Sequence, residues 1–134
     1  MNIPNKRKQT KEIILGKKKI GAANPILVQS MIKSKFSQEI LLKAEIRELI
    51  NAGCEVIRIA VTDKNSIYHI KSLIKEGFFN TVPLVADIQF DYELALLALE
   101  AGVHCVRINP GNIGGLEKTN EIIKKAKKRM PASE

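Results

Sequence analysis

The sequence has little cysteine, few aromatic side chains and no long apolar run, and each shortage excludes a class of protein. Its 134 residues include only two cysteines, Cys54 and Cys105, too few and too far apart for a metal knuckle or a disulfide framework. Because free cysteine is usually buried, both are expected to be structural. The apolar runs are strand-sized, well short of the ~18 residues that a membrane-spanning helix needs. No apolar stretch follows the basic start of the chain, so we predict no secretory signal and expect a cytoplasmic protein.

Several familiar motifs of enzymes and metal sites are missing as well. The sequence contains neither a G-x-S-x-G nucleophile motif nor a P-loop. Its first expected strand is not followed by the G-x-G-x-x-G turn of dinucleotide-binding folds. His69 and His104 have no Cys, Asp or Glu at ligand-like spacing, so no metal site is predicted.

The formal net charge of +8 is concentrated at the two ends of the chain. Residues 1–35 hold nine Lys and Arg against one acid, and residues 116–134 hold six against three. The middle of the chain is slightly acidic, with seven basic residues against ten acidic ones. No aromatic residues interleave with the terminal lysines, as a single-strand binding platform would require, so nucleic-acid binding is a minor hypothesis.

Short apolar strands alternate with amphipathic helices along most of the sequence. Strands are expected at residues 25–30, 56–61, 82–86 and 105–108, and the first reads as buried on both faces. Four helices are expected, and they should begin near Ser37, Asp63, Asp91 and Leu116. The first three should end at Gly53, Gly77 and Gly102. Residues 12–16 and 19–21 predict a small β-hairpin ahead of them.

An internal repeat narrows the fold class. Residues 52–59 and 101–108 share the pattern A-G-x-x-x-[IV]-R-I, and residues 25–28 resemble residues 83–86. We therefore predict an α/β fold that is a partial (β/α)8 TIM barrel, with about four βα units and an N-terminal β-hairpin. Residues 1–24 would form the basic segment and the hairpin, and residues 25–134 the first half of the barrel. A doubly wound open sheet is the competing interpretation.

Side-chain alternation places polar groups on one side of the predicted sheet. Arg58, Arg107 and Asn109 oppose apolar neighbours, and Asp87 ends the third expected strand in a comparable position. In a barrel this side is the interior, and the carboxyl ends of the strands hold the active site. The guanidinium group of arginine can bind a phosphate through two hydrogen bonds. These side chains, together with the backbone amides of residues 111–115, therefore predict a phosphate or diphosphate cradle. An ion pair between Asp87 and either arginine is the structural alternative, and the two interpretations are compatible.

Four ordered segments resemble the 4-hydroxy-3-methylbut-2-enyl diphosphate synthase family. They are P-I-L-V-Q-S-M at 25–31, A-G-C-E-V-I-R at 52–58, V-P-L-V-A-D-I at 82–88 and R-I-N-P-G-N-I-G at 107–114. The resemblance implies a barrel that binds 2-C-methyl-D-erythritol 2,4-cyclodiphosphate, with Arg58, Arg107 and Asn109 holding phosphates and Asp87 as an acid at the mouth. It also implies an iron-sulfur oxidoreductase of non-mevalonate isoprenoid biosynthesis, which takes electrons from ferredoxin or flavodoxin and works as a homodimer.

In that family a [4Fe-4S] cluster lies in a separate C-terminal domain, and this chain carries none of its ligands. The sequence ends where the family would enter its fifth strand, so we expect the chain alone to lack reductase activity. It also departs from the family at residues 32–36, and at Gln89, where the family has a histidine. Gln89 can hydrogen-bond but cannot carry a proton as imidazole does. The alternative function is a non-catalytic half-barrel that binds a phosphate ligand and pairs with itself or with a separate C-terminal half.

Overall fold

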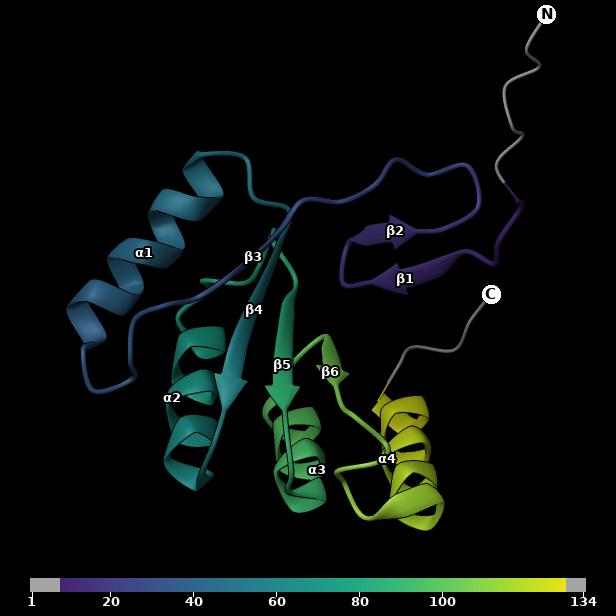
Figure 1. The fold of residues 1–134 in the computed structure, drawn as a ribbon. Coiled ribbons are helices and arrows are strands. Elements are labelled where there is room, and N and C mark those ends of the chain that lie inside the picture. The colour runs from purple at the N-terminus through teal and green to yellow at the C-terminus, as the bar shows by residue number, and fades with distance from the viewer. Residues whose placement is uncertain (1–7, 130–134) are drawn as a thin grey trace, which may run out of the picture.

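A four-stranded parallel sheet forms the centre of the protein, whose computed structural model describes residues 8–129 (Figure 1). The strands lie in chain order: β3 (Gln29–Met31), β4 (Val56–Val61), β5 (Leu84–Ile88) and β6 (Cys105–Arg107). A helix follows each strand: α1 (Glu39–Asn51), α2 (Lys64–Lys75), α3 (Tyr92–Ala101) and α4 (Gly115–Arg129). This arrangement confirms the partial barrel of four βα units, because consecutive parallel strands joined by helices are its repeating element.

The hairpin predicted near the N-terminus is present as β1 (Ile13–Leu15) and β2 (Lys18–Ile20), which pair in antiparallel fashion. It lies beside the amino ends of the sheet strands, opposite the arrowheads in Figure 1. Within residues 8–129 no helix is both long and apolar enough to cross a membrane.

The two faces of the sheet differ in what covers them. One face packs under the helices and forms the main core, which includes Ile57, Ile59 and Ala86. The opposite, inner face carries the alternate residues of each strand, as the period of two requires. At its amino end Leu15 of the hairpin packs on Val56 and Val85 in a second, small apolar cluster.

Helix ends follow the predicted chemistry except at the start of α1. Asp63 and Asp91 are the N-caps of α2 and α3, and their carboxylates accept the backbone N–H groups of Ser66 and Glu93. The prediction of Ser37 as the first N-cap is wrong, because the cap residue is Gln38 and its side chain makes no capping hydrogen bond.

The first and third strands were predicted at the wrong residues. The chain before β3 is not a strand buried on both faces, since Ile26 is 79% and Val28 57% exposed. The strand β3 begins only at Gln29, opposite Val56, so residues 25–28 precede it. The third strand is shifted two residues along the chain, so that Asp87 lies inside β5 and not at its end.

Candidate anion-binding site

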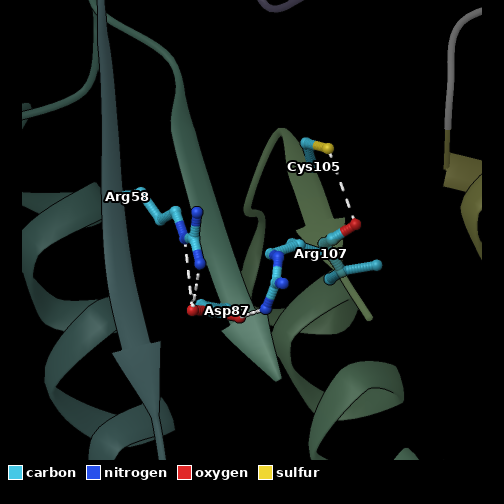
Figure 2. Close-up of polar contacts among 5 residues, drawn as sticks. Arg58, Asp87, Cys105 and Arg107 are labelled. Carbon is cyan, nitrogen blue, oxygen red and sulfur yellow. Dashed lines mark hydrogen bonds and ion pairs between the residues drawn. The ribbon is translucent and has the colours of Figure 1, made fainter. Parts of the chain in front are cut away.

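Three charged side chains from three neighbouring strands meet on the inner face of the sheet. Arg58 of β4 and Arg107 of β6 both reach toward Asp87 of β5, which lies between them (Figure 2). Arg58 donates from Nε and Nη2 to Oδ2 of Asp87 at 3.2 and 2.7 Å, and Arg107 Nη1 donates to Oδ1 at 3.0 Å. The register explains the meeting, since Asp87 is paired with Arg107 and with Ala60, two residues beyond Arg58.

The carboxylate at the centre of this cluster stays ionised. Asp87 is 1% exposed, and such burial by itself would raise the pKa of a carboxyl group. Hydrogen bonds from Arg58 and Arg107 outweigh that effect, so the pKa of Asp87 lies below its ordinary value of 3.8. The cluster therefore combines two cations with one anion and keeps a net positive charge on the inner face.

The two arginines are held to different extents. Arg58 makes two hydrogen bonds to Asp87 and its side chain is 25% exposed. Arg107 makes one hydrogen bond to Asp87 and its side chain is 51% exposed. Arg107 thus presents more of its planar guanidinium to solvent, which is the geometry that two-point recognition of a phosphate requires.

Asn109 lies in the loop between β6 and α4, two residues after Arg107. Its side-chain Oδ1 accepts the backbone N–H of Gly111 at 3.0 Å, and its backbone carbonyl accepts the N–H of Asn112 at 2.9 Å. Two backbone N–H groups of the predicted cradle, those of Gly111 and Asn112, therefore already have acceptors inside the loop. The structure brings Arg58, Arg107 and Asp87 together, and it gives Asn109 a loop-shaping contact that the sequence did not predict.

Glu45, which the sequence analysis did not single out, holds the loop that follows the carboxyl end of β3. From α1 it accepts the backbone N–H groups of Lys33 and Ser34, at distances of 2.9 to 3.2 Å, and so holds the loop that follows β3. Burial would raise the pKa of Glu45, but these hydrogen bonds outweigh it and lower the pKa. No local motif marks the residue, because its partners lie 11 and 12 positions earlier in the chain.

His104 and the two cysteines are packed against other parts of the fold, as the sequence analysis expected for the cysteines. His104 Nδ1 accepts the backbone N–H of Leu84 at 3.0 Å, and burial lowers the pKa of the imidazole. Its ring lies against the hairpin turn, where a Cβ added at Gly16 would come within 3.0 Å of the imidazole. Cys54 belongs to the core under the helices and Cys105 packs beside the small inner cluster.

The described residues do not fit an iron-sulfur cluster. Such clusters are held mainly by cysteine thiolates, commonly four, and the whole sequence has two. Cys54 and Cys105 lie in different apolar clusters. Residues 8–129 contain no group of three or more His, Cys, Asp or Glu side chains able to hold a metal ion.

Comparison with known proteins identifies one family to which the chain is similar. Residues 10–132 match the family model described as the GcpE TIM-barrel domain. The 4-hydroxy-3-methylbut-2-en-1-yl diphosphate synthase (flavodoxin) of Maridesulfovibrio salexigens is 46% identical over 123 residues, which cover 92% of this chain and 34% of that protein. The enzymes of the same name from Caldanaerobacter subterraneus and Natranaerobius thermophilus are 46% and 38% identical over the same coverage. The chain thus spans about a third of the length of the curated relatives it matches.

Proposed function

The chain belongs to the GcpE TIM-barrel family, and on that basis we propose that it forms the first four βα units of a barrel that binds a diphosphate substrate. The substrate would be 2-C-methyl-D-erythritol 2,4-cyclodiphosphate, and the reaction its reductive ring opening to 4-hydroxy-3-methylbut-2-en-1-yl diphosphate. The relatives carry the name of this synthase and name flavodoxin as the electron donor.

The observation that carries the proposal is the convergence of two guanidinium groups on one buried carboxylate. Arg58 and Arg107 approach Asp87 from opposite sides (Figure 2); Arg107 is the last residue of β6, and Arg58 lies near the middle of β4. A diphosphate has two phosphoryl groups, so each could meet one guanidinium while Asp87 keeps both arginines in place. Arginine is the side chain best shaped to bind a phosphate through two parallel hydrogen bonds.

Electron transfer belongs to a group outside the described residues. When bound, a [4Fe-4S] cluster would supply the electrons for ring opening, and flavodoxin would reduce it. The role of this chain's own residues is then to bind the diphosphate, to neutralise its charge and to fix its orientation. A cytoplasmic location and a homodimer of the complete enzyme form part of the same proposal.

The proposal can be tested with inorganic pyrophosphate as the probe and the 134-residue chain as the protein. Arg58→Ala and Arg107→Ala should each weaken binding by about tenfold or more in titration calorimetry, because a hydrogen bond to a charged group contributes roughly 1.5–3 kcal/mol. Lys17→Ala is the matched control, since Lys17 lies in the turn between β1 and β2 and lines a pocket with Pro83 and His104, each of which directly precedes a sheet strand. Unchanged affinity in both arginine variants, or an equal loss in the lysine control, would refute the assignment.

A further inference from the structure

Two loops leave the sheet beside the charged cluster, one after β5 and one after β6. The first joins β5, which carries Asp87, to α3, and the second joins β6, which ends at Arg107, to α4. The two strands are neighbours in the sheet, so both loops leave from adjacent carboxyl ends. In barrels of βα units the loops at this end of the strands form the ligand site. What holds these two loops in place therefore bears on the candidate site.

The β6–α4 loop is held firmly in its first part and ends in two glycines. Its start is closed by the turn at Asn109, and Ile113 is 2% exposed and belongs to the main core. Gly114 and Gly115 follow with φ angles of +113° and +83°, in the left-handed region that favours glycine. Because glycine restricts the backbone least, this end of the loop gains most from a contact made by another residue.

Lys118 of α4 makes that contact. A Cβ added at Gly114 would come within 2.5 Å of Cδ of Lys118, so the lysine stem fills the space beside Gly114. The Nζ of Lys118 lies 4.1 Å from the centre of the Tyr92 ring, within the range of a cation–π interaction. Tyr92 is the first residue of α3 and packs against the main core. Lys118 thus connects the end of one loop to the helix that follows the other.

The partner of Lys118 is an aromatic ring although carboxylates are close by. Asp91 and Glu93 line the same open pocket of about 410 Å³ as Lys118. Within residues 8–129 Lys118 nevertheless takes part in no ion pair. The carboxylate of Asp91 instead accepts the backbone N–H of Glu93. The contact therefore depends on the ring at position 92, and substitutions of Tyr92 can test it.

We propose that Lys118 is a positioning residue of the anion site, whose contact with Tyr92 holds the β6–α4 loop beside Arg107. The contact links the same two βα units as the ion pair between Asp87 and Arg107. With both links present, the loop and the guanidinium are ordered before a ligand arrives, and binding then costs less ordering. Lys118 itself does not contact the anion. The inference rests on the proposed function, because it requires the diphosphate to bind at Arg107.

Pyrophosphate affinities of variant chains, measured by titration calorimetry, test this role. Lys118→Met keeps the apolar stem without the charge, and Tyr92→Leu removes the ring. Each should weaken binding about two- to fivefold, which corresponds to the strength of an exposed cation–π interaction. In the double variant the two losses should not add, because both substitutions break one contact. Lys118→Arg and Tyr92→Phe keep a cation and a ring, so both should bind as tightly as the unaltered chain.

Lys124→Met is the matched control, because it removes the same charge from α4 at a residue that lines a different pocket with Glu121. Its affinity should stay unchanged, and urea denaturation should show every variant folded. Four results would overturn the inference: unchanged affinity in both Lys118→Met and Tyr92→Leu, an equal loss in Lys124→Met, additive losses in the double variant, or a loss in Lys118→Arg as large as in Lys118→Met.

NMR of the same chains separates this inference from the proposed function. Without ligand, Lys118→Met should speed hydrogen exchange at the Asn112 N–H, which donates to the Asn109 carbonyl, and unchanged exchange would contradict the contact's role in holding the loop. On addition of pyrophosphate to the unaltered chain, the ring of Tyr92 should keep shifting the Lys118 Hε signals upfield. Loss of that shift would mean that Lys118 binds the anion directly, and would overturn the positioning role.

The arginine variants show which of the two proposals has failed. If Arg58→Ala and Arg107→Ala lose affinity while Lys118→Met and Tyr92→Leu do not, the inference is wrong and the proposed function stands. Unchanged affinity in both arginine variants would refute the proposed function, whatever hydrogen exchange in the loop shows.

Discussion

The two ends of the sheet's inner face are formed by the same three strands, but one end carries apolar side chains and the other carries charged ones. At the amino end Val56 and Val85 pack with Leu15 of the hairpin, with Cys105 at their side. Two residues further along each strand, the same face carries Arg58, Asp87 and Arg107. A step of two residues returns a side chain to the same face, so one register positions both sets.

The difference separates what stabilises the fold from what can bind a ligand. At the amino end the hairpin contributes Leu15 to an apolar cluster with Val56 and Val85, and all three side chains are buried. The carboxyl end keeps a cationic cluster partly exposed around one buried carboxylate. In (β/α)8 barrels this division is general, because active sites are built at the carboxyl ends of the strands and the other end serves stability. Substitutions at the two ends should therefore give distinguishable results.

The largest expected effect on stability comes from removing the central carboxylate. Asp87→Ala leaves two guanidinium groups without their shared partner, and loss of one member of a buried ion pair costs about 3–5 kcal/mol. Because Arg58 and Arg107 are partly exposed, the lower end of that range is expected. Urea denaturation followed by circular dichroism measures the change. Asp63→Ala, which removes only the N-cap of α2, is the control and should cost about 1 kcal/mol. A loss at Asp87 no larger than this would show that the cluster is not structurally important.

The amino end should respond in stability alone. Leu15→Ala removes the hairpin side chain that packs on Val56 and Val85, at a cost of about 2 kcal/mol. Affinity for pyrophosphate should stay unchanged, because Leu15 packs on Val56 and Val85 and not on the charged cluster. A parallel loss of affinity in Leu15→Ala would mean that the two ends do not act separately.

Acid should weaken the two ends in different pH ranges, with a smaller effect than either substitution. Burial lowers the pKa of His104 from its ordinary 6.5, so the unfolded chain binds a proton more readily than the folded one. Stability from this group is present above pH 6.5 and is lost as the pH falls through the folded pKa. The pKa of Asp87 is lowered from 3.8, so its contribution is lost only at still lower pH. In His104→Gln the first decline should disappear while the second remains, as denaturation measured from pH 7.5 to 3 would show. Two declines that both persist would contradict the assignment to His104.

The sequence was sufficient to predict the features that depend on local pattern. Alternation and the A-G-x-x-x-[IV]-R-I repeat predicted parallel βα units, and Asp63 and Asp91 were correctly expected at helix starts. The same alternation put Arg58 and Arg107 on one face, where the structure joins both of them to Asp87.

Features that depend on contacts distant in the sequence could not be predicted. The apolar run at residues 25–28 was predicted to belong to a buried strand, but Ile26 is exposed and β3 begins only at Gln29, where the chain pairs with β4. Glu45 holds the loop after β3 by accepting backbone N–H groups, and such contacts cannot be predicted from residue types because every non-proline residue has a backbone N–H. The phosphate-binding role of Asn109 stays a prediction, and the hydrogen bond that its Oδ1 accepts from the N–H of Gly111 was not predicted.

The central claim is that the anion site lies at the carboxyl end of the inner face, and NMR can locate it residue by residue. We expect a titration of the ¹⁵N-labelled chain with pyrophosphate to shift the Nε–H signals of Arg58 and Arg107, and to leave the amide signals of Leu15 and Gly16 in place. Shifts confined to the lysines at 17–19 and on α4, with the two arginine signals unmoved, would contradict the claim.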